Sequence, residues 1–144
     1  MKVIEINEGK DTLLSVPKPP SYLSNSAKKH YLQMGAILAK NSRLKELYLD
    51  ALVVYSEAMA QYQFALQEIK DKNSEDFGSG FVQTFRTGAQ NVSVYVTLKN
   101  DAQDTLFKCF KIFGLDPKSE KELKGAADPN QTSLFEELMK SKNG

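Results

Sequence analysis

A row of tyrosines and alanines in the middle of the chain constrains the fold more than any other sequence feature. The row is Leu44, Tyr48, Ala51, Tyr55, Ala58, Tyr62, Ala65 and Ile69. Its members recur at alternating steps of four and three residues, the spacing of a helix packed lengthwise against another helix. Such a helix spans about 39 Å, whereas a compact domain of this chain length has a radius of gyration of only about 14–15 Å. The sequence therefore predicts an elongated helix that needs a partner helix.

The partner helix can come from the same chain or from a neighbouring copy. We assign six residues of the row to helix packing or oligomer formation: Tyr48, Ala51, Tyr55, Ala58, Tyr62 and Ala65. The alternative interpretation is an ordinary amphipathic core helix. The predicted fold class is mainly α, an elongated helical hairpin core with a small β-hairpin or ordered loop between the second and third helices. We expect the chain to form oligomers.

Capping residues and apolar periodicity predict where the first two helices lie. The first begins after Ser24, a favourable N-cap residue. Its apolar stripe is Ala27, Tyr31, Met34 and Leu38. The second runs from about Arg43 to Lys70, and Asn41-Ser42 is expected to supply its cap. The short connection requires these two helices to fold back or to cross sharply.

The second half of the core contains a glycine-rich segment and a third helix. Residues Phe77–Phe85 predict a small hairpin or an ordered loop that closes near Thr87-Gly88. The third helix is predicted from near Asn91 to Phe113, and Gly114 is expected to end it.

The chain divides into three parts on composition. Residues 1–22 form an N-terminal arm, mostly extended or mobile, because Pro17-Lys18-Pro19-Pro20 fits no regular element. Residues 23–124 form the helical core, and residues 125–144 form a linker and a C-terminal docking segment. The apolar anchors of that segment are Leu134, Phe135, Leu138 and Met139. They fit a short helix that docks in a partner's groove, and a tail packed on its own core is the alternative.

Composition narrows the class of protein. No apolar run approaches the roughly 20 residues that cross a membrane, and Met1–Lys10 lacks the apolar segment of a secretory signal. The single cysteine, Cys109, excludes an internal disulfide and lies between phenylalanines as a core residue would. We therefore expect an intracellular, soluble protein.

Charge is distributed unevenly along the chain. Between residues 24 and 45 there are five basic residues and no acidic one, namely Lys28, Lys29, Lys40, Arg43 and Lys45. The following stretch, Glu46 to Asp76, has seven acidic residues against Lys70 and Lys72. Clustered lysines and arginines offer contacts to DNA phosphates, so these five are the candidate DNA-binding residues. The alternative is a solvated helix face that lacks acids.

No arrangement of residues predicts catalysis. His30 is the only histidine and has no cysteine or histidine neighbour at metal-ligand spacing. Gly78-Ser79-Gly80 lacks the lysine of a phosphate-binding loop and does not open a helix. We expect no enzyme activity, no cofactor and no metal.

Three blocks of the sequence, taken in order, match the sequence pattern of one known protein family. The first, 19–24 with Ala27-Lys28-Lys29, is similar to the family's opening PP-x-x-L-S-x-x-A-K. The second is the long helix with Tyr55, Ala58, Tyr62, Ala65 and Ile69. The third combines Asn91, Leu98-Lys99 and Phe113-Gly114-Leu115-Asp116-Pro117-Lys118-Ser119. Taken together, the three blocks resemble the small terminase subunits of tailed double-stranded-DNA phages. Val92 and Glu120 stand where that family usually has a proline and an arginine, so we assign no DNA contact to the turn at Glu120.

The resemblance implies a non-enzymatic component of viral genome packaging. Such subunits assemble into homo-oligomeric rings, bind double-stranded viral DNA, and deliver it to the large terminase subunit, which holds the ATPase and nuclease, in the cytoplasm of the bacterial host. The resemblance also makes the large subunit a candidate partner of the C-terminal segment, with a neighbouring copy as the alternative. It implies no membrane association.

Two other classes of function stay open at this point. One is a non-catalytic structural or adaptor protein of a virion or assembly complex, whose basic residues do not contact DNA. The other is a small helical enzyme or regulator with a pocket near Phe77–Phe85. Salt-dependent binding to duplex DNA separates the terminase interpretation from the adaptor.

Overall fold

The structure is a computed structural model that describes residues 6–7 and 11–115. Its elements in chain order are β1 (Ile6–Asn7), β2 (Thr12–Leu13), α1 (Asn25–Lys40), the 3-10 turn η1 (Glu46–Tyr48), α2 (Leu49–Glu75), β3 (Val82–Thr84), β4 (Gln90–Val92) and α3 (Val94–Ile112). The described part is mainly helical, with a small antiparallel hairpin between α2 and α3, which confirms the predicted fold class. The linker and docking segment of residues 125–144 lie outside the described residues.

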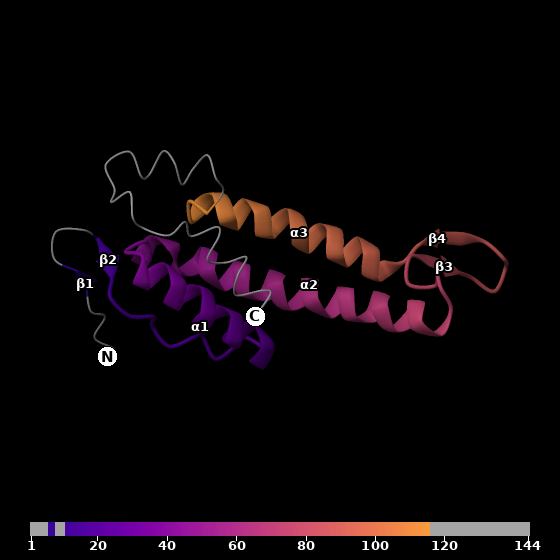
Figure 1. Ribbon diagram of the computed structural model, residues 1–144, viewed down its shortest axis with the longest axis horizontal. Coiled ribbons are helices and arrows are strands. Elements are labelled where there is room, and N and C mark those ends of the chain that lie inside the picture. Colours follow the sequence, from indigo (N-terminus) through magenta and orange to yellow (C-terminus); the bar gives the residue numbers. More distant parts are fainter. Residues whose placement is uncertain (1–5, 8–10, 116–144) are drawn as a thin grey trace.

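An elongated, antiparallel pair of helices forms the body of the molecule. Figure 1 shows α3 running back along α2, α1 lying beside the N-terminal half of α2, and the β3–β4 hairpin at the far end of the pair. No helix in the described ranges is long and apolar enough to cross a membrane.

The first helix begins as its cap predicts. The Ser24 Oγ accepts a hydrogen bond from the Ala27 amide at 3.1 Å. The predicted stripe of Ala27, Tyr31, Met34 and Leu38 is buried, each residue at most 2% exposed. Periodicity and a serine cap were therefore sufficient to place α1 and its inner face.

The predicted start of the second helix at Arg43 is wrong. Asn41 caps the end of α1 instead, and its side-chain amide donates to the Ile37 carbonyl at 2.8 Å. Ser42 then takes a left-handed conformation with φ 57°, which no helix continues. The chain makes the η1 turn and enters α2 only at Leu49.

The second helix also ends later than predicted, at Glu75 rather than near Lys70. Polar composition alone does not stop a helix, because lysine and glutamate are good helix formers on an exposed surface. The helix ends where the following loop folds back on it. The Asn73 Oδ1 in α2 accepts hydrogen bonds from two loop amides, that of Gly78 at 3.1 Å and that of Gly80 at 2.8 Å. Asn73 thus ties the loop to the last turns of α2.

The hairpin occupies part of the region assigned to the third helix. Asn91 lies in β4, paired with Gln83 of β3, so the predicted helix start at Asn91 is wrong. The actual N-cap is Ser93, whose Oγ accepts from the Tyr95 amide at 3.1 Å. Gly114, with φ 72°, follows the end of α3 as predicted.

The long apolar row of α2 faces α3 of the same chain. Tyr55, Ala58 and Ala65 are buried, and Tyr48, Ala51 and Tyr62 are partly buried. The Tyr55 ring lies between Phe110 and Phe113, with ring centroids 6.0 and 6.1 Å away. Burial raises the pKa of the Tyr55 phenol well above its usual value. The buried part of the row therefore packs within one chain.

The N-terminal residues that the structure describes lie against this core. Leu13 is 1% exposed, and its amide donates to the Leu44 carbonyl at 2.7 Å. Gly35 is buried in α1 and has both this segment and α2 against it: a Cβ there would lie 2.6 Å from a methyl of Val16 and 3.3 Å from one of Leu52. Leu13 and Val16 thus anchor residues 11–16 to the packed core.

Candidate nucleic-acid interface

The five basic residues singled out from the sequence lie on two elements. Lys28 and Lys29 are in the first half of α1, Lys40 is in its last turn, and Arg43 and Lys45 are in the connector to α2. Lys28 and Lys40 are separated by about 18 Å along the helix axis. The set is therefore spread over the length of α1 and the connector and does not form a single compact cluster.

Arg43 and Lys45 both make contacts within the fold. The Arg43 Nη1 donates to the Gly114 carbonyl at 2.8 Å, joining the connector to the end of α3. The Lys45 Nζ lies 5.5 Å from the centroid of the Tyr48 ring, within range of a cation–π interaction. Each of these cations is half-buried and has a structural role beside any role in binding DNA.

Lys29 and Lys40 share one exposed face of α1. They are eleven residues apart, which rotates them by only about 20° around the helix and separates them by about 16 Å. Both side chains are exposed, and α1 contains no acidic residue. This face, which we call the α1 basic face, is the most accessible positive surface among the five candidates.

A second surface feature lies at the hairpin end of the molecule. A cavity of about 680 Å³ opens between the end of α2, the following loop, the hairpin and the start of α3. Its lining residues are Lys72, Asp76, Phe77, Gly78, Ser79, Val82, Gln83, Thr84, Gln90, Ser93, Val94 and Tyr95. Most of the polar members are amides and hydroxyls, which can form hydrogen bonds but are poor acid–base groups at neutral pH.

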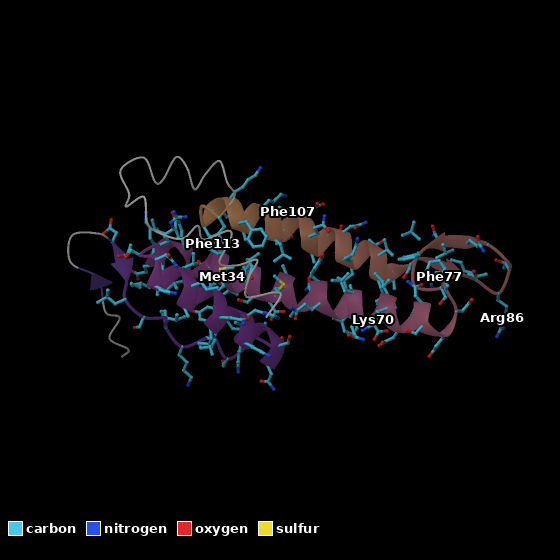
Figure 2. The ribbon with its side chains drawn as sticks, in the orientation of Figure 1. Met34, Lys70, Phe77, Arg86, Phe107 and Phe113 are labelled. Atoms are coloured by element: carbon cyan, nitrogen blue, oxygen red, sulfur yellow. The ribbon has the colours of Figure 1, made fainter. Side chains whose placement is uncertain are left out.

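Aromatic side chains are also exposed at this end, within the segment Phe77–Phe85 where one interpretation of the sequence placed a pocket. Phe77 is 84% exposed and lies edge-on to Phe81, with centroids 6.2 Å apart. Figure 2 shows Phe77 and Arg86 at this end, far from Met34 and Phe113 in the core. The glycines at 78 and 80 indicated a turn in the sequence. The exposed apolar surface that the phenylalanines form there is visible only in the structure.

Two residues with reactive side chains are used in packing. The His30 Nε2 lies 3.0 Å from the Gln63 Oε1, so the ring links α1 to α2. Cys109 is buried, its Sγ lies 3.8 Å from the Ala51 carbonyl oxygen, and burial raises the pKa of the thiol. In residues 11–115 no group of three or more histidine, cysteine, aspartate or glutamate residues could hold a metal ion.

Comparison with known proteins identifies the family. Searches against curated proteins and solved structures find no significant match. A family model described as phage terminase, small subunit, matches residues 27–130, from the first turn of α1 to beyond α3. That match covers well over half of the chain, so this protein belongs to the phage terminase small subunit family.

Proposed function

We propose that this chain is a terminase small subunit that binds viral double-stranded DNA and delivers it to the large terminase subunit, in the cytoplasm of the bacterial host. Family membership supports a role in phage DNA packaging, and this family is generally non-catalytic. The observation that carries the DNA-binding part is the α1 basic face, two exposed lysines on a helix that itself contains no acidic residue, both inside the family match.

The binding mode we propose is electrostatic. Lys29 and Lys40 contact phosphates directly, and Lys28, Arg43 and Lys45 add positive potential on either side. Each phosphate contact contributes through the release of counterions, so the affinity grows with the number of contacts. One subunit has few cations and should therefore bind DNA weakly. A homo-oligomeric ring would repeat the face and raise the affinity through effective concentration.

The C-terminal residues Leu134, Phe135, Leu138 and Met139 complete the proposal. They lie outside the described residues, and their spacing fits one side of a short helix. We propose that this helix docks in a groove of the large subunit. Docking would bring the DNA bound by the small subunit to the ATPase of the large subunit.

Duplex-DNA titration at several salt concentrations tests the DNA-binding part. The double variant Lys29→Gln with Lys40→Gln should bind more weakly than wild type, and the log–log salt slope should flatten by about 0.9 for each lost phosphate contact. The matched control is Lys108→Gln with Lys111→Gln, which removes two exposed lysines from α3. Arg43 is left intact because its bond to Gly114 supports the fold.

The two outcomes separate the proposed function from its main alternative. Equal affinity and slope for wild type and the α1 variant would show that the α1 basic face does not bind DNA. If wild type itself shows no salt-dependent DNA binding but still assembles, the protein is a structural or adaptor component.

A further inference from the structure

The β3–β4 hairpin is a two-stranded sheet with both outer edges open. The described residues provide no third strand for it, and every residue from Phe81 to Val92 is exposed. An isolated two-stranded hairpin is only marginally stable in water. We propose that this hairpin pairs edge to edge with the hairpin of a second copy of the chain, forming a sheet that continues from subunit to subunit.

Hydrogen bonding within the hairpin fixes which backbone groups face outward. The Ser93 amide donates to the Phe81 carbonyl at 2.9 Å, and the Phe85 amide donates to the Ala89 carbonyl at 2.8 Å. Hydrogen-bonded and non-hydrogen-bonded pairs alternate in an antiparallel ladder. The pair Thr84–Gln90 therefore lies at a non-hydrogen-bonded position, with its amides and carbonyls directed away from the partner strand.

The same alternation applies to the pair Val82–Val92. The Val82 amide donates to the Gly78 carbonyl at 3.1 Å, but no such bond occupies the Val92 amide. Each strand thus presents outward donors and acceptors along its edge, the arrangement that an added strand recognises.

The residues of these strands do nothing to prevent such pairing. Proteins usually protect exposed edges with lysines, prolines or bulges. Here the strands read Val-Gln-Thr and Gln-Asn-Val, with neither a charge nor a proline. The neighbouring apolar side chains are also exposed, Phe81 by 47%, Phe85 by 45% and Val92 by 60%.

Charge favours a second copy as the occupant. Asp76 and Arg86 are the only charged residues between 76 and 98 and have opposite signs. Each hairpin end therefore brings one positive and one negative charge to the contact, and the side-chain amides of Gln83 on β3 and of Asn91 on β4 can donate to and accept from the opposing edge of the next copy. A strongly charged partner would find nothing complementary on these strands.

The two edges also suit a closed assembly. In a ring, the β3 edge of one subunit meets the β4 edge of the next, and this heterologous contact closes when the rotation is a whole fraction of a turn. The hairpin projects from the end of the α2–α3 pair, away from α1, so pairing leaves the α1 basic face uncovered (Figure 1). This inference rests on the proposed self-assembly and names the surface that performs it.

Substitutions at the edges test the pairing by light scattering or native mass measurement over a concentration series. Thr84→Pro removes an outward amide that the hairpin itself does not use, and Val92→Lys places a charge on the other strand. Each should weaken self-association about tenfold or more, which corresponds to about 1.4 kcal/mol. The control, Thr87→Lys, adds the same charge in the turn outside the strands and should assemble as wild type.

Amide hydrogen exchange gives a second measurement that does not depend on the variants folding. In assembled wild type, the outward amides of Thr84, Gln90 and Val92 should be protected, and they should lose protection on dilution to monomer. Unprotected amides in the assembled protein would overturn the proposal.

Other outcomes locate the failure. If wild type assembles and both edge variants assemble equally well, the hairpin is not the interface although self-assembly stands. If deletion of residues 128–144 abolishes assembly and the edge variants do not, the contact is made by the C-terminal segment instead. A wild type that stays monomeric at tens of micromolar overturns both the pairing and the ring, while DNA binding through the α1 basic face is measured independently.

Discussion

Gly35 has no side chain, and this leaves room for Val16 of the N-terminal segment to pack against α1. Gly35→Ala should destabilise the protein by about 1–3 kcal/mol, because the new Cβ would lie 2.6 and 2.9 Å from the two methyls of Val16. Helix propensity acts in the opposite direction, since alanine is favoured over glycine by about 1 kcal/mol inside a helix. Urea denaturation of the purified variant gives the net effect.

The same substitution should cost much less when Val16 is shortened. In a Val16→Ala background the two clashing methyls are absent and only the Leu52 methyl at 3.3 Å stays close, so helix propensity should offset most or all of the cost of Gly35→Ala. Equal destabilisation in both backgrounds would mean that Val16 does not lie against α1. This double-mutant cycle therefore tests the position of residues 11–16 without any other assay.

At the residue scale, the sequence predicted which basic residues make up the candidate site, but it did not predict which of them make contacts within the fold. The run of five basic residues without an acid is visible in the chain itself. The bond from Arg43 to Gly114 joins residues 71 positions apart, and nothing in the local pattern around Arg43 indicates it. The predicted helix already puts Lys29 and Lys40 on one face, but their greater exposure than that of the other three cations depends on how α1 packs in the fold.

The contact between α2 and α3 is the element-scale feature on which the rest of the fold depends. Ala58 lies in the buried row at 5% exposure, so Ala58→Glu would bury an unpaired carboxylate. We expect a loss of several kcal/mol in the free energy of unfolding, in the range seen when a buried ion lacks its partner. Gln61→Glu, which places the same charge on the exposed side of α2, should change stability by less than about 0.5 kcal/mol.

Thermal and urea unfolding of the two variants check this prediction. Similar stability for Ala58→Glu and Gln61→Glu would contradict the packing of the row against α3. Because that packing is within one chain, destabilisation should appear even at concentrations where the protein is monomeric.

At the element scale, long periodic patterns were predictable and short ones were not. The row from Leu44 to Ile69 identified the long helix, and Ser24 identified the start of α1. The strand Gln90–Val92 was missed because three residues carry no period, and its structure depends on pairing with β3. The start of α2 was misplaced because the Asn41 side chain ends one helix rather than capping the next.

At the scale of the whole molecule, the α1 basic face and the open hairpin are separate surfaces on one elongated body (Figure 1). Under the proposed function they are nevertheless coupled, because assembly through the hairpin multiplies the number of basic faces that one DNA molecule can contact. Multivalent contact typically raises affinity by about 100-fold to 10,000-fold without any new contact in the single subunit.

Thr84→Pro should therefore weaken binding to long duplex DNA by about 100-fold, although it changes no basic residue and lies far from α1. Its binding to a duplex too short to span two subunits should match that of wild type, since one basic face meets the same phosphates in both proteins. The Lys29→Gln and Lys40→Gln variant should show the opposite pattern and lose affinity for both lengths. Gel-shift or anisotropy titrations with the two duplexes distinguish these cases. Equal loss on both lengths for Thr84→Pro would mean that the hairpin contacts DNA itself, and no loss on either would mean that binding does not use avidity.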